Sequence, residues 1–185
     1  MKSAVRTFAL LAVAAMPLAA QAKPPVKPTP VPATSAVATT KAVWAGIAGF
    51  ILQSAIDMPE DKYSFKPVAT VRSFGEIIGH VAGSQYMFCA AALGDSARKE
   101  DDIEKSTTTK AGLIEALKAS TAYCMKAYAI SEAAGRKALT MFGQKQNRFW
   151  ALVMNTSHDD EHYGNLVTYL RINGMVPPSS KPSTP

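Results

Sequence analysis

Four segments of this 185-residue chain repeat apolar residues at the spacing of an α-helix. No stretch shows the alternation of a half-buried strand, and no internal repeat is visible. The segments cover about residues 36–58, 73–93, 109 onward and 145–171. Helices that are apolar on one side must bury that side against one another. The chain is therefore predicted to be all-α, an antiparallel four-helix bundle.

Residues at the ends of these segments support the assignment. Ser73 can cap the second helix, and Glu76, three residues further on, completes a capping box. Gly94 stops that helix, and Thr109 precedes the third. Asn173-Gly174 is typical of a helix C-terminus. Each boundary therefore has a local physical reason.

The regions outside the helices predict how the chain is organised. Residues 1–22 read as a secretory signal peptide, with a basic start, a short apolar run at 8–16 and Ala20-Gln21-Ala22 as cleavage site. Residues 23–35 are rich in Pro and Lys and predict a disordered spacer. The bundle is expected over 36–176 and a flexible tail over 177–185. The protein is thus predicted to be exported, most simply to a periplasm, with no later membrane-spanning segment.

The charge of the chain argues against nucleic-acid binding. The formal net charge is +6, and removal of Lys2 and Arg6 with the signal leaves +4. No basic stripe interleaved with aromatic residues is present. A mildly basic, solvated surface accounts for the excess.

The chain contains three histidines, and two of them are spaced to share a ligand. His158 and His162 are four residues apart, which places them about 40° apart around a helix. Three imidazoles with an open position are a common catalytic metal environment. The alternative is that this pair is exposed or hydrogen-bonded. His80 lies between apolar residues, so spacing alone favours a buried packing role for it.

Polar residues accompany the histidine pair on the fourth helix. Asn155, Asn165 and Tyr169 share its side, and Asp159 and Glu161 flank its members. A zinc protease would carry Glu directly after the first histidine, where this chain has Asp159, so protease chemistry is not implied. Four residues are candidates for orienting the histidines or handling protons in a catalytic role: Asn155, Asp159, Glu161 and Tyr169.

Two cysteines lie on the second and third predicted helices. In an exported protein, a disulfide between Cys89 and Cys124 is a reasonable expectation. Cys89 follows His80 by nine residues, about half a turn away around the helix, which disfavours a shared metal. Two buried free thiols remain the alternative.

Three stretches of the sequence resemble the DinB family, the DinB/YfiT-like group of metalloenzymes. They are EDKYSFKP at 60–67, RSFGEIIGHV at 72–81 and HDDEHYGNLVTYLRINGMVPP at 158–178. The resemblance covers nearly all of the predicted bundle. It implies a four-helix bundle of DinB/YfiT type whose metal ligands are His80, His158 and His162, with zinc or nickel as the usual metal.

The resemblance and the predicted export together suggest a function. Relatives include metal-dependent hydrolases and thiol S-transferases. Export removes the usual cytosolic supply of thiols, so a metal-dependent hydrolase acting on a small molecule is favoured over a transferase. A non-catalytic periplasmic module that binds a metal or small ligand is the third alternative, and self-association into a homodimer is left open.

Overall fold

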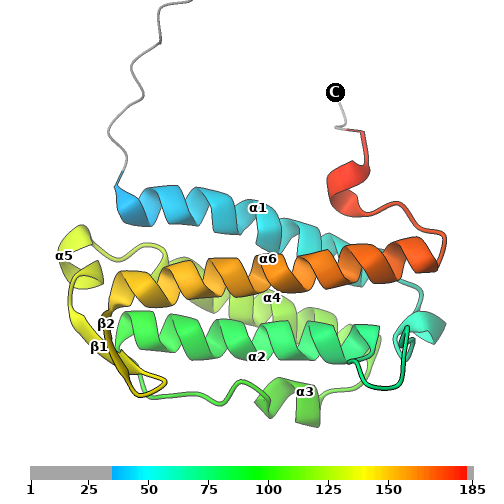
Figure 1. The fold of residues 1–185 in the computed structure, drawn as a ribbon, viewed down its shortest axis with the longest axis horizontal. Coiled ribbons are helices and arrows are strands. Elements are labelled where there is room, and N and C mark those ends of the chain that lie inside the picture. The colour runs from blue at the N-terminus through cyan, green and yellow to red at the C-terminus, as the bar shows by residue number, and fades with distance from the viewer. Residues whose placement is uncertain (1–34, 183–185) are drawn as a thin grey trace, which may run out of the picture. The chain divides into compact units, whose positions relative to one another are not determined.

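The computed structural model describes residues 35–182 of the chain. The predicted signal peptide and all of the predicted spacer except Ser35 lie outside these residues. The elements, in chain order, are α1 (Ala36–Asp57), η1 (Glu60–Lys62), α2 (Phe74–Leu93), α3 (Asp102–Ser106), α4 (Lys110–Ala127), α5 (Glu132–Gly135), β1 (Ala138–Met141), β2 (Gln144–Asn147), α6 (Arg148–Ile172) and η2 (Pro178–Ser180). The long helices α1, α2, α4 and α6 form a bundle (Figure 1), which confirms the predicted fold class.

The helices of the bundle run two in each direction, but not in simple alternation. The neighbours α2 and α4 are parallel: Cys89 and Cys124, both near C-terminal ends, are bonded, and Gly75 lies beside Leu113 near both N-terminal ends. The segment 94–109, which connects α2 to α4, carries the chain back along the bundle (Figure 1). Helices α1 and α6 run in the opposite direction. The segment 94–109 is thus a crossover connection.

Side-chain caps fix the ends of the long helices. The Ser73 hydroxyl accepts a hydrogen bond from the Glu76 amide, and the Glu76 carboxylate accepts one from the Ser73 amide, which confirms the predicted capping box. Thr109 caps α4 by accepting from the Gly112 amide. Helix α2 ends at Gly94, whose φ of 80° is left-handed.

A small β-hairpin corrects the prediction that strands are absent and that the last helix begins near residue 145. Strands β1 and β2 pair antiparallel, and α6 begins only at Arg148. The turn residues Phe142 and Gly143 both have positive φ, as in a two-residue hairpin loop. Strands of four residues are too short to produce a recognisable alternation. The one-turn helices α3 and α5 were likewise not predicted.

The core consists of two apolar clusters separated by a polar layer. The first is centred on Phe74, Ile78 and Leu166, and the second on Trp44 and Tyr128. Between them along α2, α4 and α6 lie fully buried polar side chains: Gln85, Ser120, Asn155 and Asp159. Buried polar groups are costly unless they are hydrogen-bonded, and each side chain of this layer has a hydrogen-bond partner within the core.

Two segments at the edges of the bundle differ from expectation. Within the predicted flexible tail, η2 is attached to α6, since the Tyr163 hydroxyl donates to Ser179 and accepts from its amide.

Helix α1 is long and apolar enough to cross a membrane, with a mean hydropathy of 1.2, whereas the sequence analysis predicted no membrane-spanning segment after the signal peptide. In the bundle, one side of α1 packs inward through Trp44 and Ile51.

Candidate metal centre

The three histidines meet between α2 and α6. His80 comes from α2, and His158 and His162 come from successive turns of α6. The Nε2 atom of His158 lies 3.2 Å from Nε2 of His80 and 3.2 Å from Nε2 of His162. Two ligands at 2.0–2.1 Å from one tetrahedral ion are roughly 3.3 Å apart. The three ring nitrogens could therefore hold one metal ion.

Burial keeps these imidazoles neutral, as metal ligands must be. Desolvation, followed by the positive charge of Arg72 and by repulsion from His162 and His158 whenever those rings are protonated, lowers the pKa of His80 to about 3. Desolvation is also the main cause that lowers the pKa of His158 to about 4, and it lowers the pKa of His162. At neutral pH each ring therefore has one nitrogen with a free lone pair. The donor set fits a divalent ion that accepts imidazole nitrogen.

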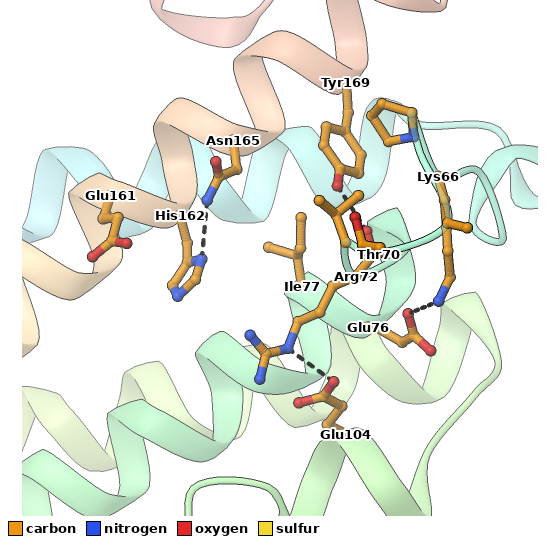
Figure 2. Close-up of a pocket in the computed structure, with 13 residues that line it drawn as sticks. Lys66, Thr70, Arg72, Glu76, Ile77, Glu104, Glu161, His162, Asn165 and Tyr169 are labelled. Atoms are coloured by element: carbon orange, nitrogen blue, oxygen red, sulfur yellow. Dashed lines mark hydrogen bonds and ion pairs between the residues drawn. The ribbon is translucent and has the colours of Figure 1, made fainter.

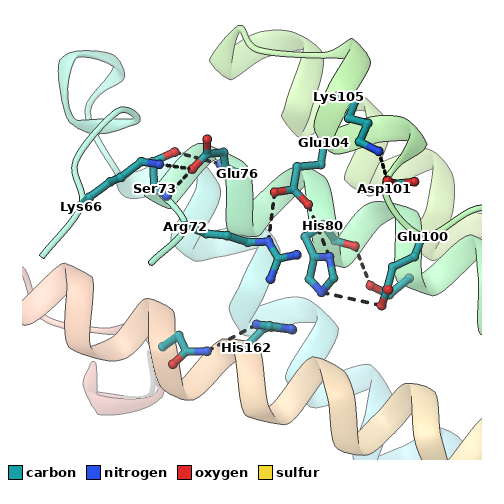
Figure 3. A network of polar contacts seen from close by, with 12 residues as sticks. Lys66, Arg72, Ser73, Glu76, His80, Glu100, Asp101, Glu104, Lys105 and His162 are labelled. Atoms are coloured by element: carbon teal, nitrogen blue, oxygen red, sulfur yellow. Dashed lines mark hydrogen bonds and ion pairs between the residues drawn. The ribbon is translucent and has the colours of Figure 1, made fainter. Parts of the chain in front are cut away.

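Two carboxylates that the sequence analysis did not identify face the cluster. The Glu100 Oε1 atom lies 3.5 Å from Nε2 of His158 and 3.7 Å from Nε2 of His80. The Glu104 Oε2 atom lies 3.5 Å from Nδ1 of His80 (Figure 3). Both residues belong to the polar segment between α2 and α4, which sequence reasoning treated as a connection. The sequence signal that could have revealed Glu100 and Glu104 is their spacing of four residues, which is typical of two side chains that point the same way.

Two glycines of α2 allow this segment to approach. A Cβ atom at Gly83 would overlap the carbonyl oxygen of Glu100, and one at Gly79 would lie 2.9 Å from the Cα atom of Glu104. Gly79 and Gly83 lie one residue before and three residues after His80. The segment that packs on these glycines therefore lies directly beside that histidine.

Asp159 does not face the cluster but belongs to the polar layer of the core. Its Oδ2 atom accepts hydrogen bonds of 2.9 Å from Trp44 Nε1 and from Gln85 Nε2. Gln85 in turn accepts from the Ser120 hydroxyl at 2.7 Å. Desolvation outweighs these bonds and raises the pKa of Asp159 to about 7. The candidate catalytic Asp159 is therefore a buried link between α1, α2 and α6.

The other polar residues on the histidine side of α6 occupy different surroundings. Asn155 is also fully buried, and its amide donates to the Tyr128 hydroxyl. The Tyr169 hydroxyl donates to the backbone carbonyl of Arg72 at 2.7 Å. The Asn165 side chain lies 3.4 Å from Nδ1 of His162, where it can orient that ring.

A pocket of about 730 Å³ opens beside the histidines (Figure 2). His162 lines it from α6, together with Glu161, Asn165 and Tyr169. The opposite side is formed by the segment before α2 and by the start of α2. The residues contributed from that side and from α3 are Lys66, Pro67, Ala69, Thr70, Val71, Arg72, Glu76, Ile77 and Glu104. Its size is that of a small-molecule site.

The cysteines lie away from this pocket. Cys89 and Cys124 form a disulfide between α2 and α4, with their Cα atoms 5.2 Å apart. Both are completely buried in the second apolar cluster.

Comparison with known proteins places the fold. Residues 51–166 match the sequence profile of the DinB superfamily. A DinB-like protein of Bacillus subtilis (YjoA) is 22% identical, with a TM-score of 0.61 over 75% of this chain and 93% of that one. A DinB-like protein of Bacillus cereus is 11% identical, with a TM-score of 0.64 over the same shares. No functionally curated protein matches the chain.

Proposed function

Because this chain belongs to the DinB superfamily, we propose that it is an exported metal-dependent hydrolase whose metal ion is held by His80, His158 and His162. The observation that carries the proposal is the convergence of three imidazole nitrogens within 4.8 Å of one another. Zinc and nickel are the metals that we expect, since both accept imidazole ligands.

The pocket beside the histidines supports an enzyme over a closed metal carrier. His162 lies on the wall of a pocket of about 730 Å³, so one side of the cluster faces space for a small molecule. A divalent ion held by three histidines lowers the pKa of a bound water and supplies a nucleophile at neutral pH.

Neighbouring residues have roles that follow from their positions. The Glu100 Oε1 atom, beside the ring nitrogens of His80 and His158, is placed to hold a proton released by a reacting water. The Glu104 carboxylate lies 3.5 Å from Nδ1 of His80 and the Asn165 side chain 3.4 Å from Nδ1 of His162, so both are placed to orient these rings once the Nε2 atoms hold a metal ion.

Thiol transfer is the rival reaction. Both cysteines of the chain are bonded to each other, so a thiol would have to come from a second substrate. Metal-loaded protein that consumes a low-molecular-weight thiol, and does not hydrolyse its substrate, would support the transferase instead.

The metal site is tested by elemental analysis of protein purified from its native compartment. We expect about one zinc or nickel per chain, and its loss in His80→Ala and His158→Ala. Lys118→Ala, at an exposed position of α4, is the control and should retain the metal. Unchanged metal content in both histidine variants would overturn the proposal.

The reaction is tested with the metal-loaded protein on a panel of small esters, amides and phosphoesters. We expect hydrolysis of one class, and its loss both on chelation and in His158→Ala. Hydrolysis that survives chelation would show that the histidine cluster is not the catalytic centre.

A further inference from the structure

We propose that Arg72 is the anion-binding residue of this pocket and that the substrate is a small acid whose carboxylate or phosphate group it holds. The inference deepens the proposed function, and it rests on that function only in placing the substrate beside the histidines. It concerns a residue that the sequence analysis did not single out.

The position of Arg72 connects the pocket with the histidine cluster. Arg72 lies two residues before α2, and it lines the pocket together with His162. Figures 2 and 3 show its guanidinium group extending toward the space between Glu104 and His162. An anion at this guanidinium would therefore lie next to the candidate metal site.

Arg72 is oriented by two hydrogen bonds, one at its backbone and one at Nε, before any ligand arrives. The Tyr169 hydroxyl donates to its backbone carbonyl at 2.7 Å, and its Nε atom donates to Glu104 Oε1 at 2.9 Å. Within residues 35–182, neither terminal nitrogen of Arg72 has a hydrogen-bond partner. A side chain that is already oriented loses less entropy when it binds.

The acidic residues around the pocket are mostly engaged elsewhere. Glu76 accepts from the Ser73 amide at 2.6 Å and pairs with Lys66 at 2.8 Å. Glu104 is held by Arg72 Nε and faces His80. Glu161, at the other side of the pocket, would repel an anion there and so favours the Arg72 side. Lys66 pairs with Glu76, so among the described residues that line the pocket the terminal nitrogens of Arg72 are the cationic donors without a partner.

The geometry of guanidinium selects the chemical class of the ligand. Its two terminal nitrogens present parallel N–H groups that match two oxygens of a carboxylate or a phosphate. The rest of such a molecule fits into a pocket of about 730 Å³. A hydrolysable bond next to the acid group would then lie at the histidines.

The experiment is a calorimetric titration with two probes, acetate and inorganic phosphate, at constant ionic strength. Each is run on metal-loaded and on chelated full-length protein, because phosphate also binds metal ions directly. We expect at least one probe to bind wild-type protein in both forms. Arg72→Gln should weaken binding roughly tenfold or more, as expected for a charged hydrogen-bonding group.

Two further variants make the result specific. Lys66→Gln removes another paired cation of the same pocket and should change binding by less than about threefold, within the range of a surface ion pair. Arg72→Lys keeps the charge but loses the planar pair of donors, so its affinity should fall between those of wild type and Arg72→Gln. Because Arg72→Lys is the milder change, the test does not depend on Arg72→Gln alone being folded. Circular dichroism checks the fold of each variant.

The outcomes separate this inference from the proposed function. The inference is overturned if neither probe binds chelated wild-type protein, or if Arg72→Gln weakens the binding of every probe that does by less than about tenfold. Metal content is measured on the same samples. Arg72-dependent anion binding in a protein that takes up no metal would overturn only the metal-dependent hydrolase. A preference for one probe identifies the acid group as carboxylate or phosphate.

Discussion

The carboxyl group of Asp159 is buried completely at the point where α1, α2 and α6 meet, one residue from His158. Its Oδ1 atom has no hydrogen-bond partner within the described part of the chain. Burying a charged carboxylate costs more than its two hydrogen bonds return, and this raises its pKa from 3.8 to about 7. The protein therefore holds a proton here that the unfolded chain would release.

This proton makes stability depend on pH in a defined direction. As pH rises from about 4 to about 7, the unfolded chain has already released the proton that the folded state still binds. The Asp159 contribution to the free energy of unfolding therefore falls across this window and is constant above it. The histidines act oppositely, because their lowered pKa values favour proton binding by the unfolded chain.

The Asp159→Asn variant separates the effect of this carboxyl group on stability from the effect of the histidines. Because the amide cannot ionise, we expect the free energy of unfolding of the variant, relative to wild type, to increase as pH rises from about 4 to about 7. Urea denaturation of metal-free protein at several pH values measures this difference. Asp160→Asn, the same change at an exposed neighbouring position, is the matched control. The same pH profile for both variants would contradict a buried proton at Asp159.

Single residues differed in how well the sequence revealed them. The four-residue spacing of His158 and His162 predicted that they face one way, which the structure bears out. The family resemblance placed His80 beside them, since its apolar neighbours on their own favoured a buried packing role. Asp159 was predicted as a residue that orients the histidines or handles protons, whereas its hydrogen bonds to Trp44 and Gln85 make it a buried link between helices.

At the scale of elements, the docking of the 100–104 segment on α2 shapes the site. The glycines at positions 79 and 83 leave room for the backbone of this segment, and Glu100 and Glu104 thereby reach His80. Close backbone approach of this kind depends on the absence of a Cβ atom.

Gly83→Ala should therefore destabilise the protein, although alanine favours helices. We expect a loss of about 1–3 kcal/mol in the free energy of unfolding, because the Glu100 backbone must move. Gly164→Ala on α6, where a Cβ would have nothing within 4 Å, is the control and should stabilise by about 0.5–1 kcal/mol. Urea denaturation measures both. A stabilised Gly83→Ala variant would show that the segment does not pack closely on α2.

Long elements were predictable from the sequence and short ones were not. The capping box at Ser73 and the cap at Thr109 are local, so four residues of sequence sufficed to find them. The hairpin at 138–147 and the single turn of α3 are held by contacts with the rest of the fold. Their few residues carry too little periodicity to be recognised.

At the scale of the whole molecule, the long connection between α2 and α4 determines the topology. It returns the chain along the bundle, so that α2 and α4 run parallel and their C-terminal ends meet. Helical periodicity indicates that helices pack, but it carries no information on their order or direction. The sequence therefore predicted the bundle without its parallel pair, and the same connection brought two unpredicted carboxylates to the histidines.

The disulfide closes this parallel pair at one end. Cys89 and Cys124 are 35 residues apart, so their bond restricts a loop that includes the whole crossover in the unfolded chain. A loop of this length corresponds to a stabilisation of about 3–4 kcal/mol in the chain-entropy estimate. The bond lies in the second apolar cluster, whereas His80 is flanked by residues of the first.

The Cys89→Ala/Cys124→Ala variant should therefore lose stability without losing the metal. We expect its free energy of unfolding to fall by about 3–4 kcal/mol from loss of the cross-link, with a further decrease from the two small cavities, while metal content stays at the wild-type level. Adding a reductant should lower the melting temperature of wild type but not that of the variant. Mass spectrometry should show wild type ~2 Da lighter before reduction than after. A melting temperature of wild type that does not respond to the reductant, together with an unchanged mass, would show that the thiols are free.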